Sequence, residues 1–71
     1  MMGLFFTIET EEEADGRWIA EVMEIPGALV YGSTSEDAVA KVQALALRVV
    51  AERLECGEES PELISVSFKA A

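Results

Sequence analysis

The segment from Asp15 to Val39, DGRWIAEVMEIPGALVYGSTSEDAV, restricts the possible folds of this chain more than any other part of the sequence. Residues that favour turns alternate in it with short apolar runs, and its last part carries the signals of a helix start. The predicted elements are, in order, a turn at Asp15-Gly16, a strand over 17–23, a corner at Pro26-Gly27, a short strand over 28–31 and a helix that begins after Thr34.

The predicted helix has signals at both of its ends. Thr34 is a good N-cap, and Asp37, three residues later, has the position of the second member of a capping box. We expect the helix to run to about Cys56, with Gly57 ending it and Pro61 barring any continuation. Its expected core face is apolar at helical spacing and consists of Ala38, Val42, Leu45, Ala46 and Val49.

Alternation of apolar and polar residues predicts which side of each strand faces the core. The first strand is expected over 4–10 and the last over 63–69, and the acidic run at 11–13 is expected to end the first one. The inward residues of the first, second and last strands are then Leu4, Phe6, Ile8, Trp18, Ala20, Val22, Ile64, Val66 and Phe68.

The element order is therefore β-β-β-α-β, in a single domain that spans residues 1–71. The first three strands form an antiparallel meander. The helix then crosses over to a fourth strand, whose simplest place is parallel to the first strand and beside it. We predict an α+β fold of two layers, in which a mixed four-stranded sheet has the order 3-2-1-4 and one helix covers one face.

The composition argues against an enzyme. The chain has no histidine, the residue that most often serves as a general base or a zinc ligand. Its single cysteine, Cys56, cannot form a disulfide within the chain, and we expect it to pack at the helix end. Without a histidine to activate them, Ser33 and Ser35 are expected to serve the turn and the helix start. Glu9 and Glu21, on adjacent strands, are expected to be hydrated rather than to bind a metal, so we expect no catalytic residue, metal or cofactor.

The net charge of −9 opposes direct binding to nucleic acid, because phosphate recognition needs clustered Lys and Arg and the five basic residues are scattered. The N-terminal sequence lacks the positive region of a signal peptide, and no window reaches the ~20 apolar residues of a membrane span. We therefore expect a cytoplasmic protein that binds neither nucleic acid nor membranes.

Acidic residues gather in two places where a basic partner could bind. One group lies in the first turn, and the other surrounds the end of the helix, where negative charge opposes the helix dipole. Solubility alone is the alternative interpretation of both groups. The candidate partner-binding acids are Glu11, Glu12, Glu13, Glu55, Glu58, Glu59 and Glu62.

The helix carries more apolar residues than one sheet should cover. Those beyond its core face widen the apolar stripe and form a candidate oligomer interface of Val39, Leu47, Val50 and Leu54. Phe5, Ile19 and Met23 are expected to form a second patch on the open face of the sheet. Because a chain of 71 residues buries little core alone, we expect a dimer or a dimer of dimers. Scattered apolar surface residues are the alternative interpretation.

The segment from Asp15 to Val39 resembles the amino-terminal domain of HicB-type antitoxins. The family pattern has an Asp-Gly turn, an aromatic residue, a strand rich in Val and Ala, a Pro-Gly corner, a short strand, Gly-x-Thr and a helix start. The matching residues are Asp15, Gly16, Trp18, Ala20, Val22, Pro26, Gly27, Gly32, Thr34, Asp37 and Ala38. The family often has a Pro where this chain has Met23, and many members carry a DNA-binding segment after the domain, whereas this chain stops at Ala71. The resemblance implies a truncated ribonuclease-H-like layout.

The resemblance also implies a function. A HicB-type antitoxin neutralises a HicA-type toxin, a small basic ribonuclease that cleaves mRNA, by covering the active site of the toxin. We therefore expect a non-catalytic protein-binding module. The alternative is an orphan structural or regulatory domain that self-assembles and has no toxin partner. An enzyme of ribonuclease-H descent is the third interpretation, but it needs several carboxylates that converge on metal ions, and the residues expected to face the core are apolar.

Overall fold

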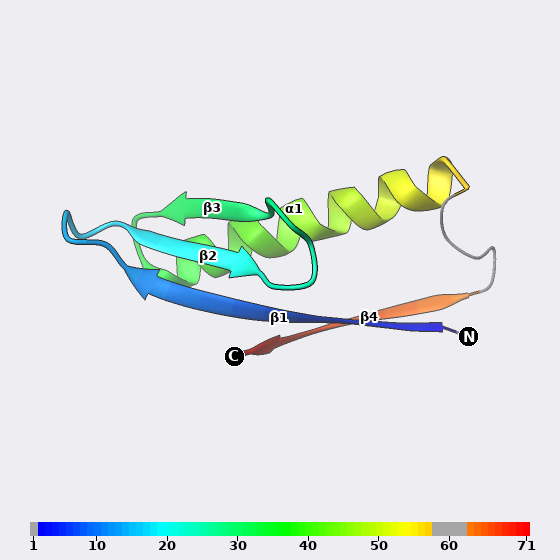
Figure 1. Cartoon of the computed structure of the whole chain (residues 1–71), viewed down its shortest axis with the longest axis horizontal. Helices are drawn as coiled ribbons and strands as arrows, with labels where there is room; N and C mark the ends of the chain where they lie inside the picture. The colour runs from blue at the N-terminus through cyan, green and yellow to red at the C-terminus, as the bar shows by residue number, and fades with distance from the viewer. Residues whose placement is uncertain (1, 58–62) are drawn as a thin grey trace.

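The computed structural model describes residues 2–57 and 63–71, which form one sheet with a long helix on one of its faces (Figure 1). The elements are β1 (Met2–Glu12), β2 (Trp18–Val22), β3 (Leu29–Gly32), α1 (Ser35–Glu55) and β4 (Ile64–Ala70). The strand order is β3-β2-β1-β4, in which β1 and β3 are antiparallel to β2, and β4 is parallel to β1. The predicted α+β class, element order and sheet order are confirmed.

β1 is longer than the sequence pattern predicts, because the acidic run does not end it. Glu11 and Glu12 lie opposite Ile19 and Trp18 in the antiparallel ladder with β2. Both glutamates are exposed, so their carboxylates stay hydrated while their backbones pair with β2. The expectation that the strand stops before Glu11 is therefore wrong, since strand pairing outweighs the low strand propensity of glutamate.

Both turns predicted between the first three strands are present. Gly16 and Gly27 have φ values of 90° and 84°, in the left-handed region that glycine adopts without strain. In the first turn, the Asp15 carboxylate accepts hydrogen bonds from the N–H of Arg17 at 3.1 Å and from its Nε at 2.8 Å. The Arg17 backbone N–H, followed by the guanidinium, holds the pKa of Asp15 below its ordinary value.

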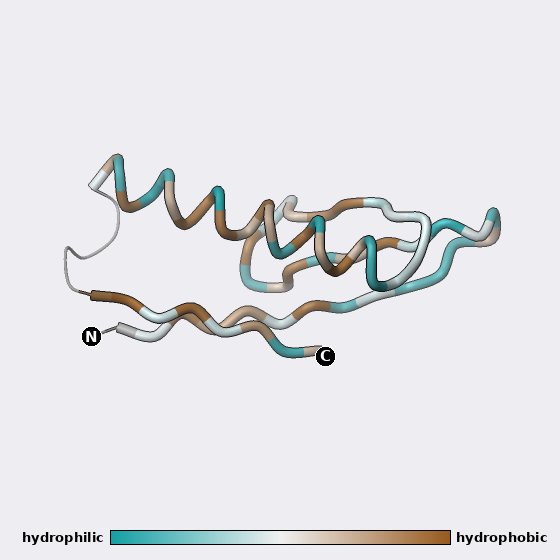
Figure 2. Tube along the Cα trace, turned by 180° about the vertical axis from the view of Figure 1, so that it is seen from behind, coloured by the Kyte–Doolittle hydropathy of each residue, from teal (hydrophilic) through white to brown (hydrophobic). Residues whose placement is uncertain are grey.

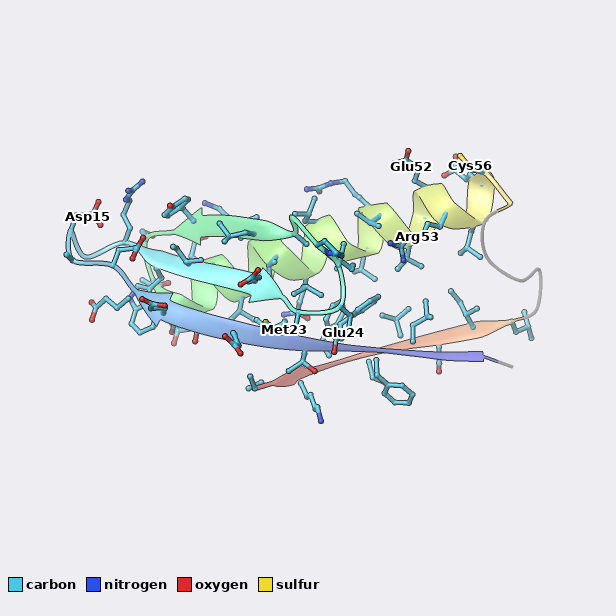
Figure 3. The ribbon with its side chains drawn as sticks, in the orientation of Figure 1. Asp15, Met23, Glu24, Glu52, Arg53 and Cys56 are labelled. Carbon is cyan, nitrogen blue, oxygen red and sulfur yellow. The ribbon has the colours of Figure 1, made fainter. Side chains whose placement is uncertain are left out.

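A carboxylate fastens the corner after β2 to β1. β2 ends at Val22, and beyond that point the N–H of Thr7 donates to Glu24 Oε1 at 2.7 Å instead of to a strand. The Thr7 hydroxyl donates to Oε2 of the same carboxylate at 2.8 Å, and the Thr7 carbonyl accepts from the N–H of Met23 at 3.0 Å. Figure 3 labels Met23 and Glu24 at this corner, beside β1. Glu24 therefore completes the hydrogen bonding of the β1 edge where β2 stops.

The contact between Glu24 and Thr7 predicts a pH dependence of stability. The Thr7 N–H, then the Thr7 hydroxyl and the charge of Lys69, hold the pKa of Glu24 below its ordinary value of 4.5. A carboxyl group with a lowered folded-state pKa stabilises the fold above its ordinary pKa, and this contribution is lost as the pH falls through the folded-state value. We expect Glu24→Gln to lower the urea midpoint at pH 7, and the difference from wild type to disappear below the folded-state pKa.

The control for this experiment is Glu55→Gln, which removes an equal charge from an exposed position at the end of α1. We expect it to leave the midpoint at pH 7 unchanged or slightly raised, because it removes negative charge from a helix C-terminus. If the effect of Glu24→Gln is the same at pH 7 and at pH 2, the ionised carboxylate does not stabilise the corner.

The N-terminus of α1 is capped as predicted, with one difference. Thr34 Oγ1 accepts from the N–H of Asp37 at 3.0 Å. The Asp37 carboxylate accepts from the N–H of Ser33 at 3.0 Å, so the return bond of the capping box reaches one residue before the N-cap. This N–H, together with the Lys41 ammonium group 3.1 Å away, holds the pKa of Asp37 below its ordinary value.

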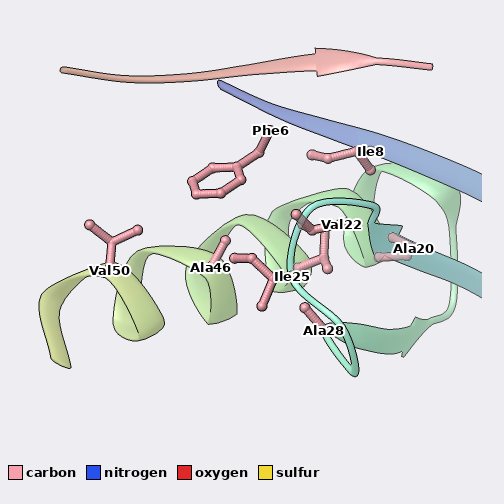
Figure 4. Close-up of a cluster of buried hydrophobic side chains, with 10 residues drawn as sticks. Phe6, Ile8, Ala20, Val22, Ile25, Ala28, Ala46 and Val50 are labelled. Atoms are coloured by element: carbon pink, nitrogen blue, oxygen red, sulfur yellow. The ribbon is translucent and has the colours of Figure 1, made fainter. Parts of the chain in front are cut away.

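The core between α1 and the inner face of the sheet is entirely apolar among the described residues (Figure 4). Its buried members are Phe6, Ile8, Ala20, Val22, Ile25, Ala28, Ala38, Val42, Ala46 and Val50. Half-buried residues pack around them: Leu4, Trp18, Val30, Val39, Leu45, Val49, Ile64, Val66 and Phe68. Every strand and helix residue predicted to face the core is in one of these two groups, so this prediction is confirmed.

The helix does not cover the sheet evenly. It packs mainly on β3 and β2 and less on β1, and the inner residues of β4 are only half-buried. A groove of about 550 Å³ lies on the β4 side, lined by Val39 and Gln43 of the helix and by Phe68 and Lys69 of β4, among others. One strand at the edge of the sheet is therefore left with incomplete cover.

Candidate functional site

The open face of the sheet, opposite α1, brings together side chains from three strands. Because Phe6 and Ile8 point into the core, the odd-numbered residues of β1 point outward. In the ladder, Glu21 lies between Glu9 and Leu29, and Ile19 lies between Glu11 and Tyr31. We call this set the acidic sheet face, and it consists of Glu9, Glu11, Ile19, Glu21, Leu29 and Tyr31.

Apolar side chains border the carboxylates of the acidic sheet face. Leu29 and Tyr31 are 42% and 44% exposed, and Ile19 between the strands is half-buried. Phe5, farther along β1 on the same face, is 71% exposed, and Met23, just past the end of β2, is 47% exposed. In the predicted patch, Phe5 and Met23 are thus exposed and Ile19 is half-buried. Leu29 and Tyr31 extend this apolar surface.

Like charges lie opposite each other on the acidic sheet face. Side chains directly opposite in an antiparallel pair have Cβ atoms about 4.5–5.5 Å apart, so Glu9 and Glu21 repel each other. A cation lies at one end, where Arg17 Cζ is 4.4 Å from the centroid of the Tyr31 ring. Its Nε is also 2.8 Å from the Asp15 carboxylate, so its charge is already paired. Basic side chains of a partner would offset the repulsion between the two glutamates.

The first predicted group of acids does not form one surface. Glu11 belongs to the acidic sheet face, whereas Glu12 lies opposite Trp18 and alternates to the other side of β1. Glu13 is half-buried in the turn, where its N–H donates to the Arg17 carbonyl at 2.7 Å. Only one member of the run 11–13 therefore joins the carboxylates of the open face.

The second predicted group of acids lies far from the first. Figure 3 labels Asp15 at the hairpin turn and Cys56 at the end of α1, and these positions are at opposite ends of the molecule. Glu55 is exposed at the helix end, and Glu58, Glu59 and Glu62 lie outside the described residues, as does Pro61. Glu55, the member of this group within the described residues, does not adjoin the acidic sheet face.

The candidate oligomer interface on the helix is divided between core and surface. Val50 is only 4% exposed and belongs to the core, so its assignment to an interface is wrong. It follows Ala38, Val42 and Ala46 at steps of four residues, which carries the buried row across the helix surface toward Phe6 (Figure 4). Val39 is half-buried against the core, whereas Leu47 and Leu54 are 48% and 39% exposed.

The serine, threonine and cysteine residues considered as possible reactive groups either serve the helix start or are exposed at the helix end. Ser33 and Thr34 serve the helix start. Cys56 is the C-cap of α1 and is exposed, so the expectation that it packs at the helix end is wrong; Gly57 follows with φ 73°, as a helix end favours. Across the described residues 2–57 and 63–71, no group of three or more His, Cys, Asp or Glu is placed to hold a metal ion. No helix in that part of the chain is both long and apolar enough to span a membrane.

The sequence places Glu9 and Glu21 on adjacent strands, but it does not by itself group them with Glu11, Leu29 and Tyr31. The alternation of the third strand contains the necessary signal, because Val30 packs inward and places Leu29 and Tyr31 on the opposite face. Which residues face each other depends on the register.

No protein-family model matches this chain, and no curated protein or solved structure matches it either.

Proposed function

We propose that this chain is a non-catalytic protein-binding module whose acidic sheet face binds a basic protein. The observation that carries the proposal is the direct opposition of Glu9 and Glu21 beside the exposed side chains of Leu29 and Tyr31. Repulsion between two carboxylates within a partly apolar surface lowers the stability of the free protein, and a basic partner would relieve that repulsion.

The composition of this face suits binding to protein. Aromatic and aliphatic side chains that become desolvated supply most of the affinity of an interface, and complementary charge mainly raises the association rate. Tyr31 and Leu29 would act as the apolar anchors, and the three glutamates would attract Lys or Arg. Direct contact with nucleic acid is not part of the proposal, since phosphates would be repelled by a chain of net charge −9.

For the partner, we propose a HicA-type toxin, a small basic ribonuclease that cleaves mRNA. The support comes from the motif resemblance, and the sheet order and single helix are those predicted from the sequence. In this proposal the module acts as an antitoxin in the cytoplasm, where mRNA is available, and blocks the toxin by covering its active site.

The test measures how fast the purified chain associates with a purified HicA-type toxin. Glu9→Lys/Glu21→Lys changes the net charge from −9 to −5, because each substitution adds two units. At ~50 mM salt we expect the association rate to fall about tenfold or more, and the wild-type rate itself to fall when salt rises to ~500 mM, where charges are screened within a few ångströms. Inhibition of mRNA cleavage by the toxin should weaken in parallel.

The matched control is Glu52→Lys/Glu55→Lys, which changes the net charge equally at exposed positions on α1. We expect it to slow association much less. Equal slowing by both double variants would show that only total charge matters and that the acidic sheet face is not the binding surface. If the toxin is neither bound nor inhibited by the wild-type chain, the antitoxin proposal fails.

The second candidate function is that of an orphan domain which self-assembles for a structural or regulatory purpose. The observation in its favour is the exposed pair Leu47 and Leu54 on α1, together with an edge strand of the sheet that the helix leaves half-covered. Self-association into a dimer or a dimer of dimers is compatible with both functions. Sedimentation equilibrium distinguishes it from a monomer of 7.7 kDa.

A further inference from the structure

The outer edge of β4 is an open strand edge of unusual composition. β4 is the last strand in the sheet order, so one side pairs with β1 and the other has no strand beside it within the described chain. It is seven residues long, from Ile64 to Ala70, and contains no proline. Proteins commonly protect such an edge with short length, proline, bulges or several charges, and here Lys69 is the one charged residue of the strand.

The hydrogen-bonding groups that β4 directs outward can be identified. The N–H of Ala71 donates to the Ile8 carbonyl at 2.9 Å, so the backbone groups of residue 71 point toward β1. Backbone groups of successive strand residues point to alternate sides. The N–H and C=O groups directed to the open edge therefore belong to Ile64, Val66, Phe68 and Ala70.

The absence of acidic residues in β4 restricts the kind of partner that can bind at its open edge. Residues 63–71, LISVSFKAA, contain no Asp or Glu, although the chain has fourteen acidic residues and a net charge of −9. Two copies that met through the acidic sheet face would place carboxylates against carboxylates. The β4 edge can meet an identical edge without that repulsion, and it offers no acidic group to a basic protein.

We propose that a second copy of this chain binds at the open edge of β4, so that two β4 strands pair antiparallel and join the two sheets into one of eight strands. This inference rests on the self-association that both candidate functions allow, and it names the surface involved. A two-fold axis at Ser67 lets the strand pair over its whole length, from Ile64 to Ala70.

This register matches both the hydrogen bonds and the side chains. Ile64 lies opposite Ala70 of the second copy and Val66 opposite Phe68. Each residue that directs its backbone groups to the open edge therefore lies opposite a residue of the second copy that does the same. These side chains are on the inner face, where the helix leaves Ile64, Val66 and Phe68 half-buried, and the second copy adds apolar neighbours. On the open face, Ser67 lies opposite Ser67 and Ser65 opposite Lys69, with no like charges paired.

The opposite edge of the sheet is less suited to pairing. β3 has only four residues, and its ends are occupied by the Pro26-Gly27 corner and by the start of α1. Figure 2 shows β4 as an alternation of hydrophobic and paler residues, whereas the hairpin end of β1 and β2 is hydrophilic. Length therefore favours the β4 edge over the β3 edge.

Cysteine cross-linking tests the surface and the register together. In a Cys56→Ser background, Ser67→Cys places two thiols at the two-fold axis, in a pair that is not hydrogen-bonded and has Cα atoms about 4.5 Å apart. This separation is within the roughly 4.4–6.8 Å range of disulfides, so mild oxidation should convert most of the chain to a covalent dimer. Ser65→Cys is the control, because its equivalents would lie about 14 Å apart, four residues along the strand, and should not cross-link.

Charge at the axis gives an independent measurement that does not depend on oxidation. Ser67 and Ser65 are both exposed, so Asp at either position should leave the subunit folded. Ser67→Asp brings two carboxylates together, and we expect it to raise the dimer Kd about tenfold or more in sedimentation equilibrium. Ser65→Asp places its carboxylate opposite Lys69 of the second copy and should leave Kd unchanged or lower it.

Three other outcomes would contradict the inference, and each would do so in a different way. A monomer of 7.7 kDa at micromolar concentration would refute the β4 pairing and self-association together. A dimer that neither cross-links at Ser67→Cys nor responds to Ser67→Asp would keep self-association but place it on another surface, such as the helix stripe with Leu47 and Leu54. Faster cross-linking between Ser65→Cys and Ser67→Cys chains would move the axis to Val66 and refute the register. Toxin binding is measured separately and is not decided by any of these results.

Discussion

Replacing Phe6 by alanine is expected to leave most of the protein unfolded at 25 °C. Phe6 is only 5% exposed, lies near Ala46 and Val50 of the helix in Figure 4, and has its ring centroid 5.6 Å from that of Phe68. Removing a buried phenylalanine side chain costs about 3–5 kcal/mol. A single core in a chain this short supplies roughly 3–5 kcal/mol, so the loss is comparable to the whole stability of the domain.

The neighbouring residue provides a control with the same chemical change. Phe5 lies on the opposite face of β1 and is 71% exposed, so Phe5→Ala should shift the urea midpoint little. Far-ultraviolet circular dichroism during urea titration measures both variants under the same conditions. Equal effects of the two substitutions would mean that the alternation of β1 does not determine its contribution to stability. If Phe6→Ala folds fully as a dimer, association supplies the missing stability.

Replacing Gly32 by alanine is expected to separate the start of α1 from the end of β3. A Cβ atom at Gly32 would lie 2.5 Å from the Ala38 backbone nitrogen, 2.8 Å from its Cα and 3.0 Å from its Cβ. The obstructing atoms belong to a helix backbone held by the Thr34 cap, so a rotamer change cannot relieve the clash. Overpacking typically costs about 1–3 kcal/mol, and we expect the upper part of this range or more, because the backbone itself must move.

Gly3→Ala is the matched control for Gly32→Ala. Its added Cβ would meet Cε2 of Phe5 at 3.1 Å, and that exposed ring can rotate away. We expect a small change in the urea midpoint for Gly3→Ala and a large decrease for Gly32→Ala. A Gly32→Ala variant with wild-type stability would show that the strand and helix do not need this close approach. The same glycine belongs to the Gly-x-Thr element of the motif, and the approach to Ala38 is a physical reason for it.

The sequence alone determined the features that depend on near neighbours in the chain. Alternation with a period of two residues identified the inward side of the strands, because successive strand residues point to opposite faces whatever the strand pairs with. The start of the helix at Thr34 was determined by a side chain that bonds a backbone group three residues away. Even the strand order followed from the element order, since a helix that joins parallel strands has few compact arrangements.

Register and the lateral position of the helix were decided only by the tertiary structure. The opposition of Glu9 and Glu21 depends on how β1 is aligned with β2, and a shift of either strand by one residue would move its glutamate to the core side. Val50 continues the helical row of Ala38, Val42 and Ala46, but the row stays buried as far as Val50 because α1 lies over β2 and β3 and because Phe6 reaches the C-terminal half of the helix. The same displacement leaves β4 half-covered. Local sequence determines which face of an element is apolar, whereas the packing of distant elements determines how much of that face remains open to a partner.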